Sequence, residues 1–477
     1  MLPQIRNDEH LYSIPKFDVK TDDIEDFHNE LKGFHDAFRD CFSRSESRDH
    51  FFKYMVGQFS ELERKSIEPI ALAVEDGNIR PMQHFISDVI WEDKKILRNY
   101  HNMVADDLGD PSGVMIFDET GFLKKGDESI GVSKQYCGGI GKVENCQVGV
   151  FAAYASPHGY ALVDKRLFIP EKWFTDDYSL RRMKCRLPED ITFMSKPQLA
   201  SQMLEEMVKE KPFPFRWVVA DSIYGSSPDF IDTVENCPDL RYFVSVPSDT
   251  PCWLTAPITR KKKYKYAGQI RERTVLESTE KKPITMESLA KSINNFFWYR
   301  RKVSEGTKGP IEYEFTKRRV VMSKNGLPDK TVWVIIRRSI GADRTYRYFI
   351  SNAPVSTRLP TFVWLSGIRW SIEQCFEETK TELGMDHYEV RKYPGWNHHI
   401  LTCMLAHFFL WHLKIRLGKK APSITVSQLR TLIEVVLPLR QYDIEMTIDM
   451  VNWIQQRNHR AYLSHRRRRL RFAVRKR

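Results

Sequence analysis

The spacing of hydrophobic and polar positions changes several times along this chain of 477 residues. Up to about residue 108, apolar side chains recur at helical intervals, which predicts a helical N-terminal domain over residues 1–108. Short runs rich in branched and aromatic side chains follow, separated by Gly, Asn, Ser and Pro. They predict strands at 114–118, 147–155, 160–169, 217–221 and 241–246. Because amphipathic segments connect the later strands, residues 109–247 are expected to be an α/β region with a mixed sheet.

Residues 248–352 have a different composition, in which lysines and arginines alternate with aromatic side chains. Several stretches there have strand-like patterns, so the region is predicted to be a β-rich insertion with a basic, aromatic face. Helical spacing returns near residue 359, and residues 353–417 are expected to complete the α/β part. A small helical extension and a basic tail are predicted over residues 418–477.

One predicted helix of the last part combines a charged stripe with an apolar stripe. At about 100° per residue, Glu373 lies about 40° round the helix from Arg369, and Lys380 lies about 20° from Arg369. The apolar stripe beside them consists of Leu365, Ile368, Ile372, Phe376 and Leu383. We expect the apolar stripe to pack against a core. A carboxylate between two cations at the edge of such a helix suits a site that holds metal and grips phosphate.

Two of the predicted strands end in an aspartate, Asp118 and Asp221. An aspartate at a strand end is commonly only a turn former or a cap. Together with Glu373, however, the two aspartates supply three carboxylates from separate elements, the donors that Mg²⁺ prefers. Two such ions, about 3.5–4 Å apart, can activate the attacking oxygen and stabilise the leaving oxygen of a phosphodiester. The sequence therefore predicts a site for two Mg²⁺ ions, for which Mn²⁺ can substitute, and phosphoryl transfer on nucleic acid.

The sequence around these residues resembles the DDE transposases of bacterial insertion sequences. The resemblance covers residues 45–410, and its motifs are Asp118-Glu119-Thr120-Gly121-Phe122, Asp221-Ser222-Ile223-Tyr224-Gly225 and Arg369-x3-Glu373-x6-Lys380. It implies an RNase H-like α/β fold with a mixed five-stranded sheet and flanking helices. A β-rich insertion would interrupt this core, and an α-helical N-terminal domain would precede it.

The resemblance also implies roles for the carboxylates. Asp118, Asp221 and Glu373 would form the catalytic, metal-binding triad. Glu119 and Glu377 are the alternative carboxylates, and Glu377 lies one helical turn beyond Glu373. The spacing of the arginine and the lysine in the third motif favours Glu373.

Basic residues near these motifs are expected to contact DNA. By the resemblance, Arg369 and Lys380 would contact phosphates near the transposon end. Lys124 and Lys125 follow the first aspartate, and we expect them to contact phosphate near the scissile strand rather than to be a solvated pair. The chain departs from the family at Ser366, which occupies the place of the tyrosine that begins the third motif.

Five further residues are candidates for DNA contact, each with a structural alternative. Arg391 and His399 lie in a family-like stretch, where they either contact the DNA end or cap helices and fasten the last helix to the sheet. Trp298 either stacks on a flipped base or packs in the core. Arg80 and Gln83 lie on the second helix of a helix-turn-helix pattern, which either reads DNA or is part of a helical scaffold.

Charge and cysteine content limit the class of protein. The net charge is +12, and the last 27 residues contain ten Lys and Arg residues and no acid. This tail either attaches to a phosphate backbone or is a solvated end. The eight cysteines are scattered without a Cys-x-x-Cys pair, and the N-terminus has no signal pattern. The apolar run from residue 400 to 417 is interrupted by charged and histidine residues, so no membrane span is expected and the chain is predicted to be cytoplasmic.

These features together predict a DNA transposase that excises and integrates an insertion sequence by a cut-and-paste reaction. Its expected partners are double-stranded DNA at terminal inverted repeats, target DNA and a second copy of the chain in a homodimer that pairs two ends. The chain would be nucleoid-associated when bound to DNA. Two alternatives remain: a transposase-derived DNA-binding regulator without cleavage activity, and a nuclease of the same fold that cleaves but does not join.

Overall fold

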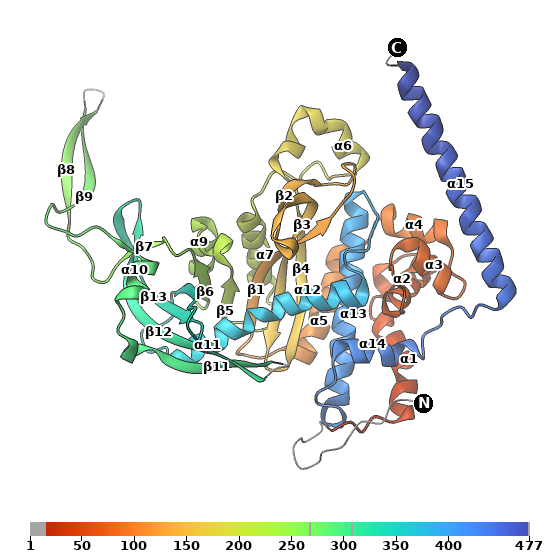
Figure 1. Cartoon of the computed structure of the whole chain (residues 1–477), viewed down its shortest axis with the longest axis horizontal. Coiled ribbons are helices and arrows are strands. Elements are labelled where there is room, and N and C mark those ends of the chain that lie inside the picture. Colours follow the sequence, from red (N-terminus) through yellow and green to blue (C-terminus); the bar gives the residue numbers. More distant parts are fainter. Residues whose placement is uncertain (1–15, 267–268, 307–308, 476–477) are drawn as a thin grey trace.

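The computed structural model of the chain describes residues 16–266, 269–306 and 309–475 (Figure 1). Its N-terminal part is helical: α1 (Thr21–Asp36), α2 (Ser45–Phe59), α3 (Ile67–Ala73), α4 (Ile79–Ser87) and α5 (Asp93–Leu108). These helices pack against α13 (Tyr393–Leu417) and α14 (Val426–Glu434) near the end of the chain. Their apolar side chains belong to the same hydrophobic core as those of the sheet.

A sheet of twelve strands forms the centre of the molecule. Its first half contains β1 (Val114–Leu123), β2 (Ser133–Cys137), β3 (Lys142–Ser156), β4 (Gly159–Phe168), β5 (Trp217–Ala220) and β6 (Arg241–Val246). Its second half contains β7 (Pro251–Trp253), β10 (Ile284–Thr285), β11 (Tyr299–Gly306), β12 (Gly309–Lys324), β13 (Leu327–Arg338) and β14 (Tyr346–Ser351). The main order is β10-β7-β12-β13-β14-β6-β5-β1-β3-β2, with β4 beside β3 and β11 beside β12.

The mixed α/β character is as predicted, but the sheet is larger than the five strands that we expected. Strand β14 pairs antiparallel with β6, with Ile350 opposite Val244, so the strands of residues 248–352 continue the sheet beyond β6. This pairing satisfies the backbone groups that β6 would otherwise leave free at an edge. Among the residues that the structure describes, only β8 (Thr259–Tyr266) and β9 (Gln269–Leu276) form a separate sheet of two strands.

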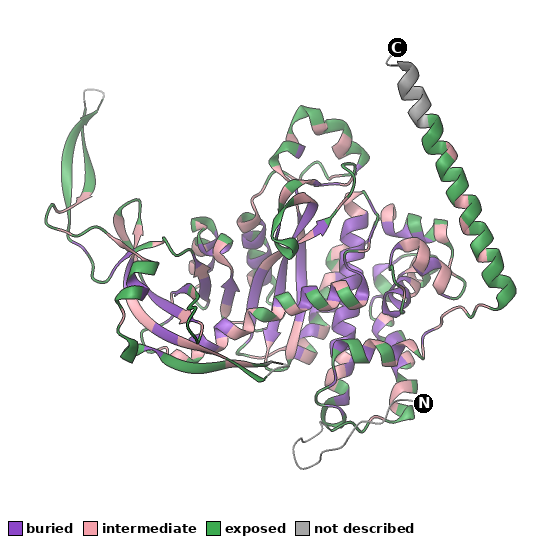
Figure 2. Ribbon diagram, in the orientation of Figure 1, coloured by how far each residue is buried: buried purple, intermediate pink, exposed green. Residues whose placement is uncertain are grey.

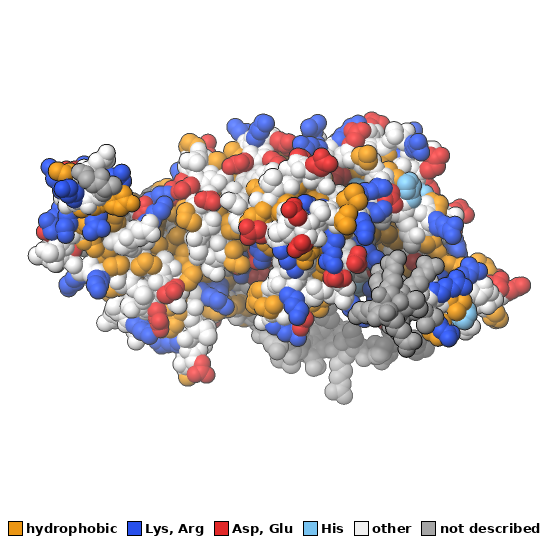
Figure 3. Space-filling model, turned by 90° about the horizontal axis from the view of Figure 1, so that it is seen from above, with side chains coloured by type: hydrophobic (Ala, Val, Ile, Leu, Met, Phe, Trp, Pro, Cys, Tyr) orange, Lys and Arg blue, Asp and Glu red, His pale blue; other side chains and the backbone are white. Residues whose placement is uncertain are grey.

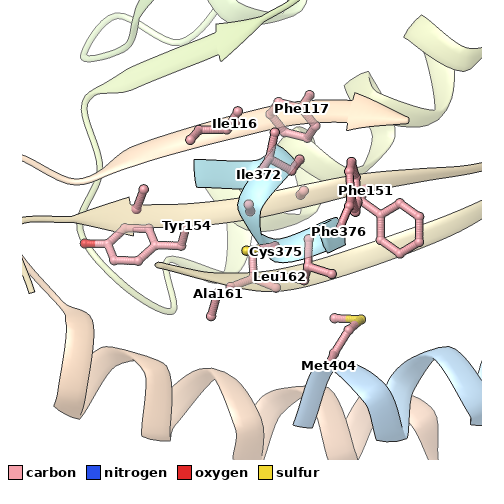
Figure 4. Packing of buried hydrophobic residues seen from close by; sticks show 14 of the residues in the cluster. Ile116, Phe117, Phe151, Tyr154, Ala161, Leu162, Ile372, Cys375, Phe376 and Met404 are labelled. Atoms are coloured by element: carbon pink, nitrogen blue, oxygen red, sulfur yellow. The ribbon is translucent and has the colours of Figure 1, made fainter. Parts of the chain in front are cut away.

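Helix α12 (Trp370–Leu383) packs its apolar stripe on the sheet as the sequence predicts. Figure 4 shows Ile372, Cys375 and Phe376 of this helix beside Phe151 and other apolar residues of the strands. The rings of Phe376 and Phe151 are 5.2 Å apart between centroids and meet edge to face. This packing fixes the opposite, polar side of α12 against the middle of β1.

The predicted helix through the third motif is interrupted at one residue. Helix α11 (Leu359–Ile368) ends and α12 begins on either side of Arg369, whose dihedral angles are still helical (φ −53°, ψ −33°). The two helices lie nearly in line (Figure 1). Glu373 therefore lies in the first turn of α12, and Arg369 lies at its N-terminal boundary.

Helix α13 is long and apolar enough to cross a membrane by length and composition, but 78% of the relevant window is buried inside the protein. Figure 2 shows this helix and the central strands as the buried parts, whereas β8, β9 and helix α15 (Ile444–Arg475) are largely exposed. Helix α13 is thus the central helix of the core. The predicted basic tail continues α15, and its side chains beyond Arg467 lie outside the described residues.

Candidate active site

Asp118 and Asp221 lie next to each other where the pairing of two neighbouring parallel strands stops. The predicted strand 114–118 continues to Leu123, so Asp118 lies within β1, whereas Asp221 directly follows β5. Strands β1 and β5 are paired with Phe117 opposite Ala220, so the two aspartates follow at equivalent positions. Asp221 caps the short helix α8 (Ser222–Gly225), and its Oδ1 accepts a hydrogen bond of 2.8 Å from the backbone N–H of Ile223. The carboxyl ends of parallel strands meet at one edge of a sheet, which is why residues far apart in sequence come together here.

Arg369 joins the first aspartate to the third predicted carboxylate. Its Nη1 is 3.3 Å from Oδ2 of Asp118, and its Nη2 donates a hydrogen bond to Oε1 of Glu373. The Asp118 side chain is 16% exposed, and that of Glu373 is 44% exposed. The site is thus an open edge at which the guanidinium of Arg369 lies between two carboxylates.

The two aspartates at this edge have raised pKa values. Burial raises the pKa of Asp118 from 3.8 to about 7, and the charges of Asp221 and Glu119 add to this, while Arg369 opposes it. Burial and the charge of Glu119 also raise the pKa of Asp221. Arg369 therefore does not offset the burial of these carboxylates, and a further cation would be stabilised here.

Glu119 points to the other side of β1, as the alternation of a strand requires. Its Oε1 accepts from the Lys196 ammonium at 2.9 Å, and its Oε2 accepts from the Tyr224 hydroxyl at 2.8 Å. Lys196 is the first residue of α7 (Lys196–Glu210). Sequence reasoning did not identify Lys196 or the role of Tyr224. In the sequence, the only indication of a role for Tyr224 is its place in the second motif. Glu119 is predicted there only as an alternative carboxylate.

Arg337 of β13 is a further basic residue that the sequence did not reveal. Burial lowers its pKa, and the charges of Arg369 and Arg347 act in the same direction, whereas Glu373 raises it. Its guanidinium lies 4.3 Å from the ring centroid of Tyr313 on β12. Strand β13 brings this arginine to the site because the sheet continues past β6, which sequence patterns did not indicate.

The lysines of the motifs are engaged within the protein. Lys380 donates from Nζ to the Thr120 hydroxyl at 2.7 Å and to the Gly121 carbonyl at 3.1 Å, which ties α12 to β1. Lys124 donates to the Tyr388 carbonyl at 3.0 Å, and burial lowers its pKa to about 7. Lys125 is exposed. Of the two lysines after the first aspartate, Lys125 is thus the more accessible to a phosphate.

Two of the predicted DNA contacts lie in the core. Trp298 is 7% exposed, and the guanidinium of Arg338 lies 4.0 Å from its ring centroid. His399 is completely buried and hydrogen-bonds to the Tyr54 hydroxyl at 2.8 Å, and burial lowers its pKa to about 3. These positions correspond to the structural alternatives that we named for both residues, namely core packing and fastening of the last helix.

The remaining candidates are on the surface. Arg80 and Gln83 are exposed on α4, whose buried face packs towards α13. Arg391 is exposed, and its backbone carbonyl accepts from the Ile130 N–H at 2.9 Å. Ser366 is buried and donates to the Val363 carbonyl within α11, so it does not reach the site. Glu377, the alternative to Glu373, is exposed on α12.

Within the described ranges, no group of three or more His, Cys, Asp and Glu side chains is arranged as a metal site. Asp118 and Asp221 nevertheless suit a hard cation, because both are carboxylates at a shared edge and both have a raised pKa. Glu373 is directed to Arg369. The oxygen donors of these side chains therefore fit Mg²⁺. To act as a ligand, Glu373 would first have to break its ion pair with Arg369.

Comparison with known proteins shows the family to which this chain belongs. A family model described as DDE superfamily endonuclease matches residues 37–310, more than half of the chain. The chain belongs to this family. The DDE match includes Asp118 and Asp221 and ends before Glu373. The resemblance to DDE transposases that the motifs indicated is confirmed.

Two known proteins are similar to this chain over most of its length. A probable transposase for insertion sequence element IS701 of Microchaete diplosiphon is 25% identical over 351 residues, which are 72% of this chain and 77% of that protein. A solved piggyBac transposase synaptic complex with hairpin DNA aligns with 91% of this chain and 74% of that chain, at 11% identity and a TM-score of 0.36.

Proposed function

We propose that this DDE endonuclease is the transposase of an insertion sequence, which cuts DNA at terminal inverted repeats and joins the ends to target DNA. The observation that carries the proposal is the pair Asp118 and Asp221 at one sheet edge, linked through Arg369 to Glu373. The order β4-β3-β1-β5-β6, in which β3 and β4 are antiparallel and β1, β5 and β6 are parallel, supports an RNase H-like core within the larger sheet.

Asp118, Asp221 and Glu373 would hold two Mg²⁺ ions, for which Mn²⁺ can substitute. Bound ions of this kind activate the attacking oxygen and stabilise the leaving oxygen of a phosphodiester. The protein itself supplies a half-buried edge, where the Glu119–Lys196–Tyr224 network fixes the middle of β1 against α7 and α8. Arg369 and Arg337 supply positive charge on the side of α12 and β13, which would attract the DNA phosphates.

DNA would approach the exposed Glu373, and the exposed Lys125 would contact phosphate. The exposed members of the predicted DNA-binding set are Lys125, Arg391, Arg80 and Gln83. Because cut-and-paste transposition brings two element ends together, we expect a homodimer in the active complex and action on chromosomal DNA in the cytoplasm.

A strand-cleavage assay tests the proposal. The DNA is a duplex that contains the inverted repeat flanking the gene, with Mg²⁺ or Mn²⁺, and products are separated on denaturing gels. Asp118→Asn, Asp221→Asn and Glu373→Gln should each reduce nicking by at least about 10³-fold, because each removes a ligand charge. Glu377→Gln is the matched control on the same helix and should cleave normally.

Addition of a target plasmid separates the alternatives. Joined product supports a transposase. Nicking without joining would contradict it in favour of a nuclease, and tight binding of the repeat without nicking would favour a regulator. Full activity of all three carboxylate variants would remove Asp118, Asp221 and Glu373 from the reaction.

A further inference from the structure

The hairpin formed by β8 and β9 stands apart from the rest of the molecule. It projects from the sheet end of the protein (Figure 1), and its strands pair only with each other. All eight residues of β8 are exposed, as are the first six of β9. Two-stranded hairpins without a packed face are at best marginally stable in water. An arm that contributes no core is therefore explained by a partner rather than by the fold.

The charge of the arm identifies the kind of partner. Between residues 259 and 276 there is one acid, Glu272, and the basic residues are Arg260, Lys261, Lys262, Lys263, Lys265, Arg271 and Arg273. Figure 3 shows the blue side chains gathered at this end of the molecule. Such a concentration of like charge repels itself in the free protein and is stabilised by a polyanion. The partner is thus a polyanion that can reach a thin, extended ribbon.

The two faces of the ribbon carry different side chains. The pairing places Lys262 opposite Arg273 and Tyr264 opposite Arg271, so these four residues share one face. Arg273 lies 5.5 Å from the ring centroid of Tyr264, and Arg271 lies 5.1 Å from that of Tyr266. Aromatic rings thus hold two guanidinium forks in place, and we call this the arginine face.

The opposite side, which we call the lysine face, is less organised for recognition. It carries Lys261, Lys263 and Lys265, together with Ile270 and the acid. The ammonium of Lys263 is 3.8 Å from the carboxylate of Glu272, so part of this charge is neutralised within the hairpin. Lysines supply point charges for phosphates, whereas stacked arginines present a planar fork that can bind two acceptors on one base edge.

We propose that the β8–β9 hairpin is a DNA-binding arm that lays its arginine face into the major groove of duplex DNA. The inference rests on the proposed function in taking DNA as the partner, and it adds a contact away from the carboxylates. The major groove of B-DNA is about 12 Å wide and admits a two-stranded ribbon. Arg271 and Arg273 contact base edges there, and the lysines contact the phosphates that border the groove.

Three variants of the full chain test the arm. In the first, residues 261–274 are replaced by Asn-Gly, which closes the remaining Arg260–Val275 pair with a two-residue turn. The second is Arg271→Ala with Arg273→Ala on the arginine face. The third, Lys261→Ala with Lys263→Ala, removes the same formal charge from the lysine face and is the matched control. Equal thermal midpoints of all four proteins, expected because the arm is exposed, show that they are folded.

Binding is measured by fluorescence anisotropy at several salt concentrations with three probes: a duplex of the flanking repeat, an unrelated DNA duplex and an RNA duplex. The shortened hairpin should reduce the slope of log K against log salt by about 3, since six cations are lost and a fraction of them contact phosphate. The arginine-face variant should bind the repeat roughly tenfold more weakly than the lysine-face variant does. RNA should show little dependence on the arm, because the major groove of A-form RNA is deep and narrow.

Three results would overturn the inference: an unchanged slope after shortening, equal losses from the two double variants, or an equal dependence of RNA binding on the arm. If the variants of the arm lose affinity for both DNA duplexes, the arm still binds the groove but has no preference for the repeat. The cleavage assay keeps the two proposals apart. If wild-type protein nicks the repeat but the arm has no effect on binding, only the arm is excluded. If no nicking occurs while the arm still governs binding, only the proposed function fails.

Discussion

Asp118→Asn is expected to make the metal-free protein more stable while it removes activity. Folding raises the pKa of this carboxyl from 3.8 to about 7, mainly through burial. The folded state therefore holds the proton more tightly than the unfolded chain does. Ionisation of Asp118 costs stability as the pH rises from about 4 to about 7, and the full cost remains above that range. Asparagine has nearly the same shape and carries no charge, so the variant avoids this cost.

The size of the effect follows from the shift. At about 1.4 kcal/mol per pKa unit, the difference between 3.8 and about 7 corresponds to about 4 kcal/mol at about pH 8, and to less than about 1 kcal/mol at about pH 4. Denaturant unfolding of both proteins in the presence of a chelator, over this pH range, measures the difference. The exposed residue Asp239 provides the control, since Asp239→Asn should change stability by less than about 0.5 kcal/mol at any of these pH values.

Mg²⁺ should reverse the order of stability. An ion held at the proposed site would stabilise only the folded wild-type protein, by mass action, whereas the variant lacks a ligand. Two results would refute the argument that the site does not compensate the charge of this carboxyl. One is an Asp118→Asn protein that is equally or less stable than wild type at about pH 8. The other is a difference in the free energy of unfolding that does not vary with pH.

Three further predictions concern residues around the site. Trp298→Ala should lower the free energy of unfolding by about 3–5 kcal/mol, because the ring is buried. The control Phe296→Ala, at a residue that is 81% exposed, should change it by less than about 0.5 kcal/mol. Equal effects of the two substitutions in denaturant unfolding would contradict the placement of Trp298 in the core. Thr120→Val removes an acceptor of Lys380 and should cost about 1–3 kcal/mol by the same measurement, and an unchanged midpoint would mean that Lys380 does not tie α12 to β1. Lys124→Met should stabilise the protein most below about pH 7 and progressively less as the pH rises. The reason is that the buried ammonium has a pKa of about 7 and its charge is costly only while it is protonated. A gain in the free energy of unfolding that grows with pH would contradict this.

Local patterns were sufficient to predict the elements that hold the site. The apolar run before Asp118 is the first half of β1, which continues to Leu123, and the run before Asp221 is β5; the stripe with Ile372 and Phe376 is the buried face of α12. These predictions succeed because strand and helix periodicities reflect burial on one side of an element. The chemistry of the three carboxylates already grouped the three segments into one predicted site, and the resemblance to DDE transposases supported that grouping.

Long-range pairing was beyond such reasoning. The pairing of β14 with β6 joins segments about a hundred residues apart, and no local feature distinguishes a strand that extends a sheet from one that starts a new one. The partners of Lys380 and the burial of Trp298 follow from that tertiary arrangement. Spacing on an ideal helix placed Arg369 near Glu373 correctly, but it could not show that Asp118 lies on the other side of the same guanidinium.

The most direct test of the central claim is the position of bound metal. Crystals or particles of the protein with its flanking-repeat duplex and Mn²⁺ should show two ions by anomalous scattering or density, each about 2.0–2.2 Å from carboxylate oxygens of Asp118, Asp221 or Glu373. The account predicts that Glu373 has left Arg369 in this complex. Ions bound elsewhere, or a Glu373 still paired with Arg369 in a complex that cleaves its DNA, would contradict it.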